Sequence, residues 1–148
     1  MENPKDYGFN SQLIHYSGHH DAFGAATVPI YQTSTFAFES AQDGADCFAG
    51  VKPGYMYTRI GNPTVKALER QVALLEHACD SVAVASGMAA VSTVYLGLLN
   101  AGDHVVSSSA VYGASRVLME QHMSRFGVES TYVNTANLEE VKAAMRPN

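Results

Sequence analysis

The sequence predicts an α/β protein in which an N-terminal arm precedes a mainly parallel sheet flanked by helices. From residue 62 onward, short apolar β-branched runs alternate with helical patterns of about a dozen residues. Before that point the chain shows little periodicity. Its 148 residues, of which 47% are hydrophobic, are enough for one compact domain. We therefore expect an arm over residues 1–60 and the first part of an α/β domain over residues 61–148.

The arm is irregular and rich in Gly, Thr, Ser and aromatic residues. Pro29 and the run from Tyr31 to Phe36 predict an extended segment. Such a segment has few ways to bury its aromatic side chains by itself. We therefore expect it to wrap another surface, either the core of its own chain or a partner subunit.

The first regular elements follow residue 61. Asn62 is a good N-cap, Pro63 fits the first helical position, and apolar residues recur at helical spacing up to Leu75. The short run 81–85, Ser-Val-Ala-Val-Ala, predicts a buried strand. Residues 88–100 then predict a largely buried helix that ends in a turn at 101–103.

Two further strand–helix pairs complete the chain. We expect strands at His104–Ser107 and Val128–Val133, with a helix over 113–126 between them that Gly127 closes. Thr135 or Asn137 then caps a helix that runs through Met145. The alternation predicts βαβ units, a parallel sheet and helices on both of its faces.

Charge and hydropathy argue against some classes of function. The net charge is −5, from 9 basic and 14 acidic residues, which argues against a nucleic-acid partner. The longest apolar stretch, 88–99, is interrupted by polar residues and is too short to span a bilayer. The first residues do not resemble a secretory signal, so we expect a cytoplasmic protein without a membrane partner.

The cysteines and histidines do not suggest a metal site. Cys47 and Cys79 lie far apart without a metal-binding or redox spacing, and we expect both thiols to be buried. His15 and His19 have helical spacing and His20 follows, but no carboxylate or cysteine completes a site. A solvated arm is the favoured interpretation of these histidines.

The first candidate site is Ser86-Gly87-Met88, where the predicted strand gives way to a helix. The helix start offers free N–H groups and the positive end of its dipole, Gly87 allows an anion to approach, and Ser86 adds a hydroxyl. The segment matches neither the dinucleotide glycine pattern nor a P-loop. A turn with a purely conformational role is the alternative.

Two further candidate sites each contain a tyrosine. In an extended segment Tyr57 and Arg59 would project to one side, so that a phenol and a guanidinium face one phosphate or carboxylate. Tyr112 follows the strand at 104–107 and would lie at the same sheet edge as Ser86, where its ring could stack on a flat cofactor. The alternatives are a surface Arg beside a half-buried Tyr, and a Tyr that only covers the sheet edge.

Taken together, these motifs resemble one family over the whole chain. Chain order, residue types and spacing are similar to those of the transsulfuration, or Cys/Met-metabolism, family of pyridoxal 5′-phosphate (PLP) enzymes of fold type I. The segments that carry the resemblance are Gln32–Phe36, Tyr57–Arg59, Gly61–Thr64, Ser86–Ala90 and Tyr112-Gly113. The arm around Tyr7–Asn10 and Phe48–Gly50 is most similar to the methionine-cleaving lyases of this family.

The resemblance implies a site and an assembly. Ser86, Gly87 and Met88 would bind the PLP phosphate, and Tyr57 and Arg59 would reach the cofactor of a neighbouring subunit. Tyr112 would stack on the cofactor ring and act as the acid for the departing thiolate. The substrate would be a small sulfur amino acid, no metal would be needed, and the protein would be a homotetramer built as a dimer of dimers.

Two departures keep alternatives open. Ala114 stands where the methionine-cleaving lyases commonly carry Cys, so a sulfhydrylase or a cystathionine-forming or -cleaving enzyme fits as well. None of the four lysines, Lys5, Lys52, Lys66 and Lys142, matches the context of the family's Schiff-base lysine. We therefore expect the N-terminal portion of an enzyme, inactive alone, and keep a non-catalytic binding or assembly module as the alternative.

Overall fold

The computed structural model of the chain describes residues 7–15 and 23–147. These residues belong to two compact units, one extending to Ala83 and the other beginning at Val84. The predicted boundary between arm and domain near residue 60 stays a prediction.

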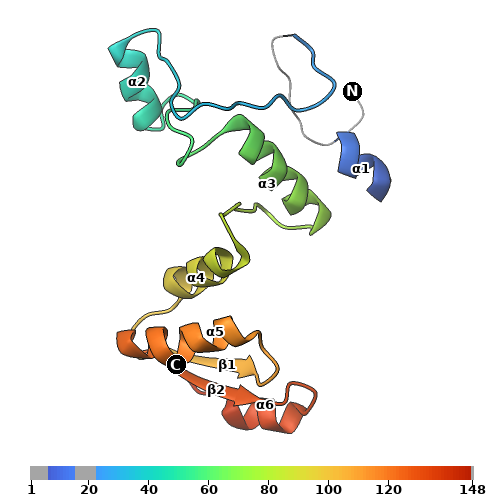
Figure 1. Cartoon of the computed structure of the whole chain (residues 1–148), viewed down its shortest axis with the longest axis vertical. Coiled ribbons are helices and arrows are strands. Elements are labelled where there is room, and N and C mark those ends of the chain that lie inside the picture. Colours follow the sequence, from blue (N-terminus) through green and yellow to red (C-terminus); the bar gives the residue numbers. More distant parts are fainter. Residues whose placement is uncertain (1–6, 16–22, 148) are drawn as a thin grey trace. The chain divides into compact units, whose positions relative to one another are not determined.

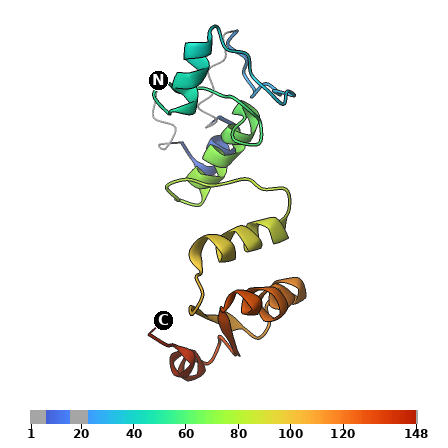
Figure 2. The ribbon, with the colours of Figure 1, turned by 90° about the vertical axis from the view of Figure 1, so that its left-hand side faces the viewer.

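In its described residues, the first unit contains three helices, α1 (Phe9–His15), α2 (Ala41–Phe48) and α3 (Pro63–Leu75). The start of α3 is as predicted, because the Asn62 Oδ1 accepts a hydrogen bond from the Thr64 N–H at 2.9 Å and Pro63 takes the first position. α1 packs beside the second half of α3, where the Gln71 amide donates to the Gln12 carbonyl at 3.2 Å (Figures 1 and 2).

Helices α1 and α2 correct the prediction of a wholly irregular arm. Two acidic residues and a central glycine lie within α2, so its sequence does not show a clear helical pattern. Yet Ser40 caps it, accepting from the Asp43 N–H at 3.1 Å, and Gly44 packs under Phe38, where a Cβ would lie 3.1 Å from the ring. The run 31–36 forms no helix (Figure 1), and its pairing is a single antiparallel bridge between Thr35 and Tyr57.

The predicted buried strand at 81–85 is wrong. Among the residues that the structure describes, none pairs with this segment, and Val82 is 76% exposed. A strand needs a neighbour for its backbone groups, and residues 80–83 instead bind α3. The Ser81 hydroxyl donates to the Glu69 carbonyl at 2.7 Å, and the Ala83 N–H donates to the Glu69 carboxylate at 2.9 Å.

The second unit holds the sheet. Strands β1 (His104–Ser108) and β2 (Glu129–Val133) are parallel, with His104 opposite Glu129 and Ser108 opposite Val133. Figure 1 shows α5 (Gly113–Val117) and α6 (Leu138–Ala144) on opposite sides of the two strands. These observations confirm both predicted strands, their parallel pairing and helices on both faces. Of the two caps that the sequence left open, Thr135 and Asn137, the structure uses Asn137.

The helix between the strands changes its winding along its length. α5 runs into a π-helical segment, η2 (Leu118–His122), and then into a 3-10 turn, η3 (Met123–Phe126). Gly127 closes it in the left-handed conformation with φ of +81°, as predicted. Met119 and Met123 lie fully inside, against Val128 and the strand residue Val105, and form the core of this unit.

Two predictions of burial are wrong. Helix α4 (Gly87–Leu98) has no residue buried against the rest of the described chain, and Leu98 is 73% exposed. Cys47 is only partly buried and Cys79 is exposed. Both errors have the same cause: in the described residues, each unit has too few packed layers to cover α4 or the two cysteines.

Candidate functional site

Tyr57 and Arg59 lie together in the first unit and line one surface hollow of about 690 Å³. The Arg59 guanidinium carbon lies 5.4 Å from the centroid of the Tyr57 ring, within the range of a cation–π contact. Within the described part of the chain, no carboxylate pairs with Arg59. The hollow therefore presents a guanidinium whose donors remain available to an anion.

The backbone brings these two side chains together in an unexpected way. The segment does not continue extended, because the N–H groups of Ile60 and Gly61 both donate to the Tyr57 carbonyl, at 2.9 and 3.0 Å, and close a turn. The juxtaposition that the sequence predicts is present, but a turn produces it rather than the alternation of a strand.

Sequence reasoning missed that this turn is tied to the run 29–36, which we call the strap. The Thr58 N–H donates to the Ser34 carbonyl at 2.9 Å, and the Phe36 N–H donates to the Met56 carbonyl at 3.1 Å. Asn62 joins the same network beyond its role as a helix cap. Its burial, at 3% exposure, is the structural sign of that role, and no local pattern in the sequence marks it.

Ser86, Gly87 and Met88 begin helix α4 in the second unit. Ser86 takes up two N–H groups of the first turn: its hydroxyl accepts from Ala89 at 3.0 Å and its carbonyl from Ala90 at 3.0 Å. The N–H groups of Gly87 and Met88 have no partner among the described residues. A Cβ at Gly87 would meet no atom of another segment within 4 Å, so the space beside Gly87 is open. This arrangement fits a phosphate group.

Tyr112 precedes α5 in the same unit, and its side chain is 71% exposed. The Ser115 hydroxyl lies 3.8 Å from the Met88 sulfur, so the first turns of α4 and α5 are in contact. Tyr112 and Ser86 therefore stand at the starts of two touching helices. They do not share a sheet edge in the described structure, because no strand precedes Ser86. Nearby Arg116 is engaged elsewhere, with Glu120 at 2.8 Å and the Tyr132 ring at 4.3 Å.

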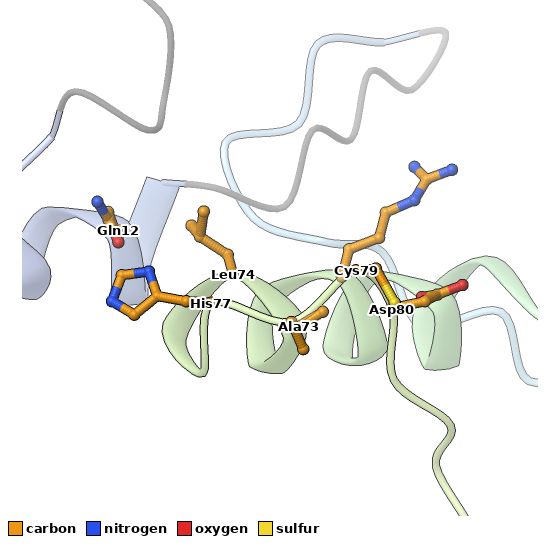
Figure 3. Close-up of a pocket in the computed structure, with 8 residues that line it drawn as sticks. Gln12, Ala73, Leu74, His77, Cys79 and Asp80 are labelled. Carbon is orange, nitrogen blue, oxygen red and sulfur yellow. The ribbon is translucent and has the colours of Figure 1, made fainter.

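The six predicted residues thus form two sets, Tyr57 with Arg59 in one unit and Ser86, Gly87, Met88 and Tyr112 in the other. Outside both sets, a hollow of about 360 Å³ lies at the end of α3. Figure 3 shows the polar residues Gln12, His77 and Asp80 around it together with Cys79. None of the six predicted residues lines this second hollow.

Shifted titrations in the first unit belong to surface ion pairs. A hydrogen bond from Lys66, at 3.1 Å, lowers the pKa of Asp80, and the same bond raises the pKa of Lys66. A hydrogen bond between Lys52 and Asp43 likewise lowers the pKa of Asp43 and raises that of Lys52. These pairs fasten α2 and α3 to their neighbouring segments and take no part in the predicted site.

Neither a group of metal-ligating side chains nor a membrane-spanning helix is found in the described residues. No group of His, Cys, Asp and Glu side chains in these ranges could hold a metal ion. The predicted solvated histidines His19 and His20 lie outside the described residues. No described helix is long and apolar enough to cross a membrane.

Comparison with known proteins identifies the family. A family model described as Cys/Met metabolism PLP-dependent enzyme matches residues 10–148. The chain belongs to this family. The resemblance drawn from the sequence motifs is thereby confirmed.

Curated relatives give the same result. The chain is 46% identical over 144 residues to the L-methionine gamma-lyase of Fusobacterium nucleatum subsp. polymorphum, an alignment that covers 97% of the chain and 36% of the relative. It is 38% identical to the O-acetyl-L-homoserine sulfhydrylase of Corynebacterium glutamicum, with 99% and 34% covered. The chain therefore spans about a third of the length of these relatives.

Solved structures confirm the predicted fold class. The metB protein of Corynebacterium glutamicum superimposes with a TM-score of 0.87 at 39% identity, over 99% of this chain and 37% of the other. An O-acetylhomoserine (thiol)-lyase of Campylobacter jejuni, solved with a pyridoxyl-lysine monophosphate, gives a TM-score of 0.83 at 28% identity, over 98% and 33%. The chain is thus part of a PLP-dependent fold type I architecture.

Proposed function

We propose that this chain is the N-terminal part of a PLP-dependent carbon–sulfur lyase, an L-methionine gamma-lyase. The complete enzyme would convert methionine and water to methanethiol, 2-oxobutanoate and ammonia. The observation that carries the proposal is the start of α4 in a chain that belongs to a PLP-dependent family. There, two N–H groups have no partner among the described residues, and the space beside Gly87 is open.

The phosphate of PLP is the group that these residues would hold. The N–H groups of Gly87 and Met88 donate to it at the positive end of α4. The Ser86 hydroxyl accepts from Ala89, which leaves its own proton free to be donated to the phosphate. Tyr57 and Arg59 supply a phenol and a guanidinium to the phosphate of a neighbouring subunit's cofactor.

Tyr112 has the chemistry of a general acid. PLP, when bound, acts as an electron sink for carbanion chemistry at the substrate. The exposed ring of Tyr112 is available to stack on the cofactor ring. Its phenol O–H is a proton donor, so Tyr112 can hand a proton to the departing sulfur.

The proposed assembly has each cofactor bound by residues from two subunits. We place the complete protein in the cytoplasm as a homotetramer built from two dimers, with Tyr57 and Arg59 acting across the dimer interface. Apolar side chains left exposed on α3, such as Leu68 at 57% exposure, support a partner surface beside this segment.

A second candidate function is O-acetylhomoserine sulfhydrylase, in which a thiol is added at the γ carbon in place of elimination. Two observations favour it: Ala114 stands near Tyr112 where a Cys is common in the methionine-cleaving lyases, and a sulfhydrylase is among the curated relatives. A non-catalytic binding or assembly module, from a different functional class, remains the third candidate for the chain by itself.

Two assays of purified protein separate these candidates. The complete polypeptide and the 148-residue chain are each mixed with PLP and dialysed, and we expect visible absorbance to survive only in the former. The coloured protein is then given methionine, or O-acetylhomoserine with sulfide. Formation of 2-oxobutanoate from methionine supports the lyase, homocysteine alone supports the sulfhydrylase, and a colourless complete polypeptide overturns both enzyme functions.

A further inference from the structure

The strap and the turn that carries Tyr57 and Arg59 are joined by side-chain hydrogen bonds as well as by backbone bonds. The Thr64 hydroxyl donates to the Pro29 carbonyl at 2.9 Å and accepts from the Tyr31 N–H at 2.9 Å. The Thr58 hydroxyl donates to the Thr33 carbonyl. Segments about thirty residues apart in sequence are thereby held as one piece.

Asn62 stands at the centre of these bonds. Its side chain is almost fully buried, at 3% exposure, and both ends of its carboxamide are used. The Oδ1 accepts from the Thr64 N–H at 2.9 Å, while the Nδ2 donates to the Tyr31 carbonyl at 2.9 Å and to the Thr58 hydroxyl at 3.0 Å. The residue therefore caps α3 and anchors the strap and the turn at once.

Capping alone does not require an asparagine. Ser and Asp serve about equally well as N-caps. Neither of them carries the two amide hydrogens that Asn62 donates here, and an Asp would set a carboxylate against the Tyr31 carbonyl. The structure thus uses a property that only an amide provides at this buried position.

The bond to Thr58 connects Asn62 to the site. Thr58 lies between Tyr57 and Arg59, and both of these side chains face the hollow. With its hydroxyl held by Asn62 and Thr33, and its N–H held by Ser34, Thr58 cannot rotate independently of the strap. The orientation of the guanidinium over the Tyr57 ring depends on this anchoring.

We infer that Asn62 is a positioning residue for the cofactor phosphate: it fixes, through Thr58, the geometry in which Tyr57 and Arg59 bind that phosphate. The inference rests on the proposed function and extends it to a residue that touches neither the cofactor nor the substrate. It assigns Asn62 an effect on phosphate recognition that a simple helix cap would not have.

The test compares PLP with pyridoxal, which lacks the phosphate, in titrations of the complete apoprotein. Asn62→Ser keeps the cap and neutrality but loses both donated bonds, and we expect a roughly tenfold weaker affinity for PLP. Pyridoxal affinity should not change. An equal loss for both ligands, or no loss for PLP, overturns the inference.

Other variants make the result specific. Asn137→Ser is the matched control, because Asn137 also caps a helix and donates to Glu140 at 3.0 Å but makes no hydrogen bond to any of the six predicted site residues. It should leave both affinities unchanged. If Asn62→Ser fails to fold, Thr58→Val removes the same link and should reproduce the selective loss, while Thr58→Ser should restore PLP binding. In an Arg59→Ala background, Asn62→Ser should add little further loss.

The same titrations separate failure of the inference from failure of the proposed function. If the unsubstituted complete protein does not bind PLP more tightly than pyridoxal, the proposed phosphate site itself is wrong. If it does and Asn62→Ser preserves that preference, the phosphate site stands and the positioning role of Asn62 is wrong.

Discussion

Tyr112 combines high exposure with a fixed position. Its backbone starts α5, whose first turn touches that of α4 through Ser115 and Met88, while 71% of its own surface remains accessible. A side chain placed in this way can meet a ligand without any rearrangement of the core. The acid role proposed for Tyr112 can therefore be tested by a substitution that removes only the hydroxyl.

We expect Tyr112→Phe in the complete enzyme to lower kcat by roughly 10²-fold or more while PLP affinity is retained, because the ring stays and only the acid is lost. Product formation from methionine and PLP titration measure the two effects. Tyr132→Phe is the control, since the buried Tyr132 hydroxyl has no hydrogen-bond partner in the described structure. Unchanged turnover in Tyr112→Phe would contradict the assigned role.

At the scale of residues, the sequence allowed the candidate side chains to be predicted but not their supports. Residue type and spacing sufficed to pair Tyr57 with Arg59, although a turn rather than a strand brings them together. The second role of Asn62 depends on a carbonyl 31 residues away. Such a contact is created by the fold and leaves no trace in local patterns.

Helix α3 is fastened to the segment that follows it by Lys66. The ammonium contacts Asp80 at 3.1 Å and Glu69 at 3.4 Å, and the hydrogen bond to Asp80 shifts the pKa of both partners, down for Asp80 and up for Lys66. The contribution of Asp80 to stability is thus present above pH 3.8 and is lost as the pH falls further. The contribution of Lys66 is present below pH 10.5 and is lost as the pH rises further.

We expect Asp80→Asn to lower the melting temperature of the complete protein slightly, by an amount that is constant between these two pH values. The difference from the unsubstituted protein should shrink toward both extremes. Thermal unfolding followed across pH measures this dependence. Glu139→Gln, which removes the partner of Lys142 in a more exposed pair, should have no effect. A difference that is largest at acid pH would contradict the pairing.

Gly127 ends the helical run before β2, with φ of +81° and with Ala101 close by. A Cβ at this position would lie 3.3 Å from the Ala101 Cβ. We expect Gly127→Ala to cost about 1–2 kcal/mol of unfolding free energy, measured by chemical denaturation. Adding Ala101→Gly should recover only the part of this free energy that comes from the contact with Ala101, because the positive φ at residue 127 remains. Stability equal to that of the unsubstituted protein would contradict the strain.

At the scale of elements, prediction succeeded where the signal is local. The caps Asn62 and Asn137, the closing Gly127 and both strands of the parallel pair follow from residue type and order. The prediction of a strand at 81–85 was wrong because a strand needs a second strand to pair with. In the described chain that segment instead forms hydrogen bonds to α3. The π-helical segment within 118–122 also has no recognisable sequence signal.

At the scale of the whole molecule, α4 is the most informative element. It contains no charged residue, and none of its side chains is buried within the described chain. A helix that is apolar on all sides belongs in an interior. The burial predicted for α4 therefore requires surfaces that the described residues do not supply.

We expect the 148-residue chain, expressed alone, to bind a hydrophobic dye such as ANS strongly and to associate in solution. The complete polypeptide should bind far less dye, because α4 is then covered. Fluorescence titration and light scattering compare the two. Replacing the exposed Leu96 and Leu98 by Gln in the short chain should reduce dye binding. Equal dye binding by both polypeptides would contradict the interpretation.

The neighbour of Asn62 has a consequence for the durability of the protein. Asparagines commonly age when the next backbone nitrogen attacks the carboxamide, a reaction that converts the amide into an acid. Pro63 has no N–H, so this route is closed at Asn62. The proline that begins α3 thus also closes this route to the loss of the carboxamide that links Asn62 to Tyr31 and Thr58.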